Sequence, residues 1–206
     1  VNGNIEVKLT TDNSLRVVEC CGKQGEVKVY KGCEYPIAST LISWTAQSLR
    51  GVPIREGSKD NATAVHPDQL PLPAPTIKEE EDSAVVFLIE TLLAAEDGEI
   101  TLVPVGPLTN IAVAMRADPR IIPKIKEIMI MGGGHDVNNS SPAAEFNVWV
   151  DPEAFEIVLQ SGCKITLVPL DATHKCFMTV DEAKKVRAIG TNPAILVADL
   201  IEQRTT

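Results

Sequence analysis

The sequence lacks long apolar runs and a recognisable leader. No stretch reaches the roughly 18 consecutive apolar residues that a membrane-spanning helix needs. Residues 1–10 show no basic segment followed by an apolar one, so they do not resemble a secretory signal peptide, and they contain no initiator methionine. We therefore expect a cytoplasmic protein that does not bind membranes, and a chain that has been processed or cut from a longer one.

Basic clusters and paired cysteines are also missing. The formal net charge is −9 and no group of Lys and Arg offsets it, which argues against a surface for nucleic acid. The five cysteines form no C-x-x-C pair and no ligand spacing with histidine, which favours reduced, intracellular thiols. The chain does have 44% apolar residues, enough for the core of a single domain spanning residues 1–206.

Hydrophobic periodicity predicts alternating helices and strands. The predicted helices span residues 6–21, 40–50, 84–95, 108–116, 151–160, 181–189 and 192–206, with a further short one from 119. The predicted strands span residues 27–30, 100–105, 127–131 and 164–170. Four prolines in residues 66–75 predict an extended surface connection. The fold class is α/β, with a mostly parallel central sheet and helices on both faces, because the last three strands are fully apolar.

Parallel sheets of this kind bind ligands beyond the carboxyl ends of their strands. Three segments rich in glycine and polar residues lie at such positions, at 105–110, 132–147 and 171–174. The topology therefore predicts a site at this edge of the sheet.

The glycine run Gly132–Gly134 follows a predicted strand. It can form a tight turn that brings backbone N–H groups to an anion or a sugar, or it can be no more than a permissive loop. A dinucleotide-binding fingerprint is excluded, because Val137 occupies the position of its third glycine.

The polar residues that follow are Asn138, Asn139, Glu145 and Asn147. In an extended segment, Glu145 and Asn147 would point the same way and Phe146 the opposite way. A carboxylate beside carboxamides offers the donors and acceptors that a polyol requires. A solvated loop rich in asparagine is the alternative interpretation.

Several strings in this sequence resemble the inosine–uridine-preferring nucleoside hydrolase family. They are MGGG at 131–134, AEFN at 144–147, DPEA at 151–154, VPVGPLTNIA at 103–112, LDATHK at 170–175 and the Gly3-Asn4 pair. They occur in the family's order and spacing. The resemblance covers most of the chain and implies a truncated form of that fold.

The resemblance implies a sugar-binding role for five residues near the glycine run. Asn139 and Glu145 match positions that hold the ribose 5′-hydroxyl, and Asn147 matches one on the side of the 2′ and 3′ hydroxyls. Met131 matches a residue that lines the ribose pocket, and Phe146 a residue beside it.

The resemblance also implies hydrolysis of the N-glycosidic bond of a nucleoside with the help of calcium. Val105 falls where a main-chain carbonyl binds the ion, and Asn4 matches an asparagine that contacts the sugar. Calcium prefers oxygen ligands, and the transition state has oxocarbenium character. The resemblance further implies a homo-oligomer for the full-length protein.

The family's catalytic carboxylates have no counterpart in this sequence. Neither its motif D-x-D-x-x-x-D-D nor its later His-Asp pair is present, so we identify no catalytic residue and expect the chain to be incomplete at both ends. Asp136, Asp151 and Asp171 are single, and Asp151 is expected to cap a helix.

The histidines offer no replacement. The nearest match to the family's H-G-x-D-G-L-G has Glu56 in place of the histidine, and His66 lies too close to the proline-rich connection to take that role. His135 is expected to face solvent, and His174 is expected to form structural hydrogen bonds.

Three hypotheses remain open. The chain is part of an N-ribosyl hydrolase and is inactive alone, or it is a ribose-binding module of the same fold that binds without calcium. The third hypothesis is an unrelated doubly wound nucleotide-binding domain, which the missing phosphate loop disfavours.

Overall fold

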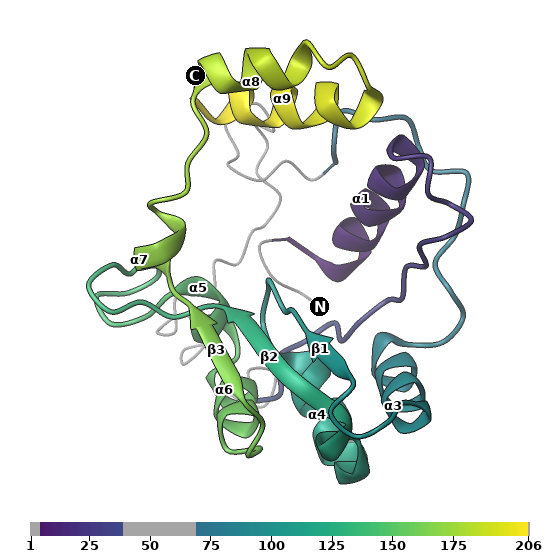
Figure 1. Cartoon of the computed structure of the whole chain (residues 1–206), viewed down its shortest axis with the longest axis vertical. Helices are drawn as coiled ribbons and strands as arrows, with labels where there is room; N and C mark the ends of the chain where they lie inside the picture. Colours follow the sequence, from purple (N-terminus) through teal and green to yellow (C-terminus); the bar gives the residue numbers. More distant parts are fainter. Residues whose placement is uncertain (1–4, 39–68, 206) are drawn as a thin grey trace.

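The computed structural model describes residues 5–38 and 69–205, which form helices around a small parallel sheet (Figure 1). In chain order the elements are α1 (Val7–Cys20), α3 (Ala84–Ala94), β1 (Ile100–Leu102), α4 (Thr109–Ala117), the 3-10 helix η2 (Pro119–Lys124), β2 (Ile125–Met131), α5 (Phe146–Val150), α6 (Pro152–Leu159), β3 (Ile165–Val168), α7 (Leu170–Thr173), α8 (Val180–Arg187) and α9 (Asn192–Thr205). The predicted α/β class is confirmed. The helix predicted at 40–50 lies outside the described residues.

The sheet has the order β1-β2-β3, and both pairs of strands are parallel. Two strands are shorter than the sequence predicts. β1 ends at Leu102, before Pro104, and β3 ends at Val168, before Pro169. Proline has no N–H group to donate to a ladder, so each strand ends shortly before its proline.

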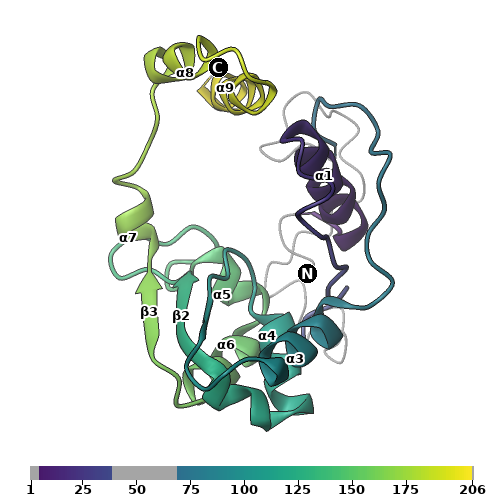
Figure 2. The same cartoon turned by 45° about the vertical axis from the view of Figure 1, so that its right-hand side comes forward.

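Helices α3, α4 and α6 share one core with the sheet. Ile128 and Ile130 of β2 are fully buried in it, and so are Ala112 of α4 and Val158 of α6. α4 lies between its two neighbours in this layer (Figure 2). Burial of a large aliphatic side chain stabilises a fold by about 1.5–3 kcal/mol, so this layer is the stable part of the molecule.

The opposite face of the sheet is more open in the described part of the chain. Glu127 and Met129 alternate with the core residues of β2, and Thr166 lies beside them on β3. Met129 is 38% exposed, while the Thr166 hydroxyl donates to Glu127 at 2.5 Å. Helices were expected on both faces of the sheet. Among the described residues, α3, α4 and α6 cover one face, and the other face is partly exposed.

The predicted strand at 27–30 is wrong. The segment forms no strand, and it lies against the start of α3 and the residues just before that helix. The Val29 carbonyl accepts the N–H of Glu80, and the Tyr30 ring stacks on Phe87 with 4.0 Å between centroids. A ladder needs a second strand with regular pairing, and a helix N-terminus cannot supply one.

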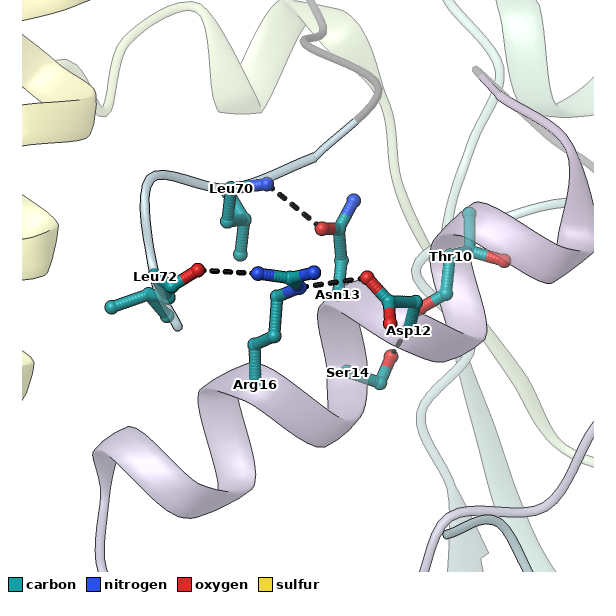
Figure 3. A network of polar contacts seen from close by, with 7 residues as sticks. All are labelled: Thr10, Asp12, Asn13, Ser14, Arg16, Leu70 and Leu72. Carbon is teal, nitrogen blue, oxygen red and sulfur yellow. Dashed lines mark hydrogen bonds and ion pairs between the residues drawn. The ribbon is translucent and has the colours of Figure 1, made fainter. Parts of the chain in front are cut away.

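A row of side chains along α1 binds the proline-rich connection (Figure 3). The Asn13 Oδ1 accepts the N–H of Leu70 at 2.9 Å, and the Arg16 guanidinium donates to the Leu72 carbonyl. One turn further on, the Glu19 carboxylate accepts the N–H of Thr76 at 2.9 Å. These residues are three apart, so they share a helix face. Residues 69–75 form no helix or strand, as expected of the proline-rich connection, but the segment bends where the Leu72 N–H donates to the Leu70 carbonyl.

The last two helices form a hairpin at a distance from the sheet (Figures 1 and 2). Arg187 of α8 donates to Asp199 and Glu202 of α9, both at 2.7 Å. Thr179 and Glu182 form a capping box at the start of α8, since each side chain accepts the backbone N–H of the other residue. Within the described part of the chain, no helix is long and apolar enough to cross a bilayer.

Candidate functional site

The candidate site lies at the carboxyl end of β2. Here the glycine-rich loop, residues 132–144, leads from the central strand to α5. The loop leaves the sheet gradually, because the Gly132 N–H still donates to the Val168 carbonyl of β3, at 3.2 Å. Further along, the Leu170 N–H donates to the Gly133 carbonyl at 3.0 Å. The first turn of the loop is therefore fixed to the end of the neighbouring strand.

Two glycines of this loop are required by its geometry. Gly133 has a φ of +76°, a conformation that side chains with a Cβ rarely adopt. A Cβ on Gly134 would lie 1.9 Å from the Val137 carbonyl oxygen, and no real Cβ approaches an atom that closely. The run of glycines is therefore explained by a tight turn.

The N–H groups of this turn are used within the chain. The N–H of Gly133 donates to Glu145 at 3.1 Å, and those of His135 and Asp136 donate to Asp171 at 2.7 and 2.9 Å. A bound anion would have to compete with two carboxylates for these donors. Of the two interpretations of the glycine run, the structure favours the permissive turn over an anion cradle.

Glu145 connects the turn to α5. Its side chain is only 2% exposed, and its carboxylate accepts the N–H groups of Asn147 at 2.9 Å and Val148 at 3.3 Å besides that of Gly133. Glu145 is thus the N-cap of α5. The prediction that residues 145–147 are extended is wrong, because the cap starts a helix at Phe146. Glu145 and Asn147 consequently do not lie on one side by strand alternation.

The structure nevertheless brings four of the predicted sugar-binding residues together. Asn147 Nδ2 donates to the Met131 carbonyl at 3.2 Å and lies 3.2 Å from its sulfur. Asn139 Oδ1 accepts the N–H of Phe146 at 2.9 Å, which places it beside Glu145. Hydrogen bonds therefore connect the end of β2, the loop and α5 into one wall.

This wall keeps some capacity to bind a polyol. A carboxylate offers about four lone-pair positions. Three N–H groups occupy three of those positions on Glu145, which leaves about one for a hydroxyl group. Asn139 is exposed, and its carboxamide nitrogen can donate. The Phe146 ring lies 6.2 Å from that of Trp149, so an aromatic pair adjoins the wall on α5.

Asp151 has a structural role, as predicted. It is fully buried and accepts the Thr109 hydroxyl at 2.6 Å, the Ile37 N–H at 3.0 Å and the Ala154 N–H at 3.1 Å. These donors come from three separate parts of the chain, so the carboxylate joins them at the start of α6. It is not free to act on a ligand.

The other predicted positions do not complete the site. Asn4, Glu56 and His66 lie outside the described residues. Val105 is 76% exposed and follows β1, next to Pro104, whose carbonyl accepts the N–H of Met131. It thus lies at the expected edge of the sheet.

The described residues do not fit a calcium ion. Calcium takes six to eight oxygen ligands. In the described ranges, 5–38 and 69–205, no three His, Cys, Asp or Glu side chains lie close enough together to hold a metal. The main-chain carbonyl of Val105 would be a single ligand.

Neither described histidine approaches the wall as a reacting group. The side chain of His135 is 88% exposed, and its Nδ1 lies 2.9 Å from Asp136, which confirms the prediction that it faces solvent. His174 is exposed at the end of α7, where its backbone N–H donates to the Leu170 carbonyl. The structural bond at His174 is therefore made by its backbone.

Asp171 is a residue whose part in the site the sequence did not reveal. Its carboxylate accepts two consecutive N–H groups of the glycine-rich loop, from His135 and Asp136. These two bonds, first that of His135, hold the pKa of Asp171 below its ordinary value of 3.8. The available signal was its position directly after a strand, but its partners are 35 and 36 residues away.

Comparison with known proteins identifies the family of the chain. The sequence profile described as inosine-uridine preferring nucleoside hydrolase matches residues 1–205. The chain belongs to the inosine-uridine preferring nucleoside hydrolase family. Membership excludes the hypothesis of an unrelated nucleotide-binding domain.

Relatives within this family are longer than the chain. It is 37% identical to the inosine-uridine preferring nucleoside hydrolase of Leishmania major over 208 residues, which cover 98% of this chain and 60% of that protein. It is 38% identical to a pyrimidine-specific ribonucleoside hydrolase, RihB, of Escherichia coli, over 98% of this chain and 59% of the relative. The chain thus spans less than two thirds of the length of these relatives.

Solved structures of nucleoside hydrolases have the same fold. A plant nucleoside hydrolase, PpNRh1, matches with a TM-score of 0.80 and 26% identity, over 99% of this chain and 60% of the other. A purine-preferring ribonucleoside hydrolase from Gardnerella vaginalis matches with a TM-score of 0.77 and 29% identity, over 98% and 60%.

Proposed function

We propose that the segment Met131–Asp151 forms the ribose-binding wall of a ribonucleoside hydrolase. In this proposal Asn139, Glu145 and Asn147 bind the sugar hydroxyls, and Met131 and Phe146 line the pocket. The observation that carries it is the hydrogen bonding that connects Met131, Asn139, Glu145 and Asn147 at the carboxyl end of the central strand. Ligands of parallel α/β sheets bind at that edge.

The reaction we propose for the whole protein is hydrolysis of the N-glycosidic bond, which releases ribose and the free base. The relatives include pyrimidine-specific and purine-preferring hydrolases, so the proposal extends to ribonucleosides as a class. The contribution of this chain's residues is binding and orientation of the sugar. A grip on the sugar lowers the barrier where it holds the ring in its reactive geometry.

We expect that this chain by itself has no nucleosidase activity and binds calcium only weakly. Calcium is implied by the family, with Val105 as a main-chain ligand, but the described residues supply no carboxylate cage for the ion. We assign no step of the reaction to the metal. For the same reason no residue of the chain is proposed as the catalytic base.

A second candidate is a ribose-binding module that acts without calcium. It is supported by the same hydrogen-bonded set of Asn139, Glu145 and Asn147, and by the finding that no three metal-binding side chains cluster among the described residues. For the whole protein the two candidates predict different responses to the ion, whereas for this chain both predict binding that calcium does not change.

Calorimetric titration with 1,4-dideoxy-1,4-imino-D-ribitol, a cationic ribose mimic, tests the ribose wall that both candidates share. We expect weak binding that is unchanged by millimolar calcium, and that the N147A variant weakens about tenfold. The Asn192→Ala variant, on α9, serves as the matched control and should bind as the unchanged chain does.

The outcomes are distinct. Absence of any binding at millimolar ligand would overturn the ribose wall itself. Tight binding that depends on calcium would refute the binding module and the proposed lack of a calcium site together. Release of base from inosine or uridine by this chain would contradict the proposed inactivity.

A further inference from the structure

Asp171 holds a loop to which it does not belong. It is the second residue of α7, directly after β3, and its two carboxylate oxygens accept one N–H each. Oδ2 lies 2.7 Å from the His135 nitrogen, and Oδ1 lies 2.9 Å from the Asp136 nitrogen. Hydrogen bonds to an ionised group are about twice as strong as those between neutral groups. The pair of bonds therefore forms a clamp on the outer part of the glycine-rich loop.

The loop has little else to define its shape at this point. Residues 134–136 are exposed, and they belong to no helix or strand. Gly133 is held by Glu145 and by the Leu170 N–H, but these two bonds are made at Gly133 and not at residues 134–136. Polyglycine backbone loses more conformational freedom on ordering than any other, so an unclamped turn would sample many shapes.

The turn leads directly into the sugar-binding wall. Three residues after Asp136 comes Asn139, whose side chain accepts the Phe146 N–H. Between them, Asn138 Nδ2 donates to the Pro142 carbonyl at 3.3 Å. The position of both asparagines relative to Glu145 thus depends on the path of the turn.

We propose that Asp171 is a positioning residue for the ribose wall, which orders the turn at residues 133–136 and so places Asn139. This inference rests on the proposed function. The role assigned to Asp171 is exercised through the loop, because each of its oxygens accepts a backbone N–H group of that loop.

Two substitutions of Asp171 test the clamp directly. Asp171→Ala removes both acceptors, and Asp171→Asn keeps one acceptor oxygen and replaces the other with a donor. We expect hydrogen exchange at the amides of His135 and Asp136 to accelerate about tenfold or more in the alanine variant, and less in the asparagine variant. Asp118→Asn is the matched control, since Asp118 also accepts a backbone N–H but caps η2.

The second readout is the dissociation constant for the iminoribitol. We expect Asp171→Ala to weaken binding about tenfold, Asp171→Asn to recover part of the loss, and Asp118→Asn to change nothing. Because a merely structural role would lower the thermal midpoint without affecting the folded protein's affinity, the midpoint of each variant is measured as well.

Each result decides the matter. Unchanged exchange at His135 and Asp136 in the alanine variant would overturn the clamp. Faster exchange with unchanged affinity would overturn its role in positioning the sugar. If the unchanged chain binds no iminoribitol, the proposed function fails and the positioning role with it, whereas the exchange rates still show whether the clamp exists.

Discussion

Two buried carboxylates begin the two consecutive helices α5 and α6, and their surroundings differ. Glu145 caps α5 and accepts three backbone N–H groups, one of them from the glycine-rich loop. Asp151 caps α6 and accepts donors that include the Thr109 hydroxyl of α4 and the Ile37 N–H. Glu145 thus joins an exposed loop to its helix, whereas Asp151 joins helices of the core.

The comparison shows that burial of an acidic side chain does not reveal its function. Both residues are closed off from solvent and both are helix caps. What distinguishes them is what their partners do. The loop that Glu145 holds carries Asn139 and leads away from the end of β2, where ligands bind in such sheets. The partners of Asp151 belong to the packed layer around Ile128.

The largest expected effect is that of Asp151→Asn. The Asn side chain has an NH₂ group in place of one carboxylate oxygen. This group would face one of the donors that now bond to Asp151, and the two donors could not bond to each other in a site that is 0% exposed. We expect a loss of about 2–4 kcal/mol of unfolding free energy in urea titration. Affinity of the folded fraction for the iminoribitol should stay the same. A loss below about 0.5 kcal/mol would show that Asp151 does not hold the core together.

The second-largest effect is expected for Gly134→Ala, because this substitution disturbs only the glycine-rich loop. Its Cβ would meet the Val137 carbonyl oxygen at 1.9 Å, so the backbone must move. We expect a cost of about 1–3 kcal/mol and a clear loss of iminoribitol affinity. Gly25→Ala is the matched control, since a Cβ there has nothing within 4 Å. Equal behaviour of the two variants would contradict the tight turn.

Glu145→Gln tests the other carboxylate. One of its oxygens becomes a donor and opposes an N–H group that it now accepts, so we expect about 1–2 kcal/mol of destabilisation. If Glu145 also binds the sugar, iminoribitol affinity falls about tenfold at the same time. The control is Glu182→Gln, which changes the cap of α8 without touching the wall. A loss of stability with full affinity would make Glu145 a cap only.

The smallest effect is the acid titration of Asp171. Its folded pKa lies below the ordinary 3.8, so its contribution to stability is present above 3.8 and is lost as the pH falls through the lower folded value. We expect the amide proton shifts of His135 and Asp136 to titrate below pH 3.8, and Asp171→Asn to abolish this.

A local probe is needed for this titration because other carboxyl groups also have lowered pKa values. They are Glu19, Asp118, Glu127, Asp181 and Glu182. Global acid unfolding would report all of them together. A midpoint at or above 3.8 for the two amides would contradict the clamp by a charged Asp171.

Much of the regular structure could be read from the sequence. The apolar run at 127–131 became β2, the Asp-Pro pairs at 118 and 151 start η2 and α6, and Thr179 with Glu182 form the capping box of α8. These features depend on neighbours within a few residues. Local chemistry is enough to specify them.

The errors have local causes as well. Residues 27–30 alternate like a strand, but no strand in the described part of the chain pairs with them. Residues 145–147 were expected to be extended, and a glutamate is an uncommon N-cap, so the start of α5 gave little signal. In both cases the outcome depended on which donor groups the rest of the fold brought near.

The sequence by itself determined the family and the order of the sheet strands and of most helices, and it predicted which segment binds the sugar. Those follow from motifs and periodicity, which are properties of neighbouring residues. Only the tertiary structure decided that Glu145 and Asp171 hold the turn at Gly133–Asp136 from two sides. Their partners lie 12 and 35 or 36 residues away along the chain, and a side chain's hydrogen bonds over such separations are set by how the strands and helices pack.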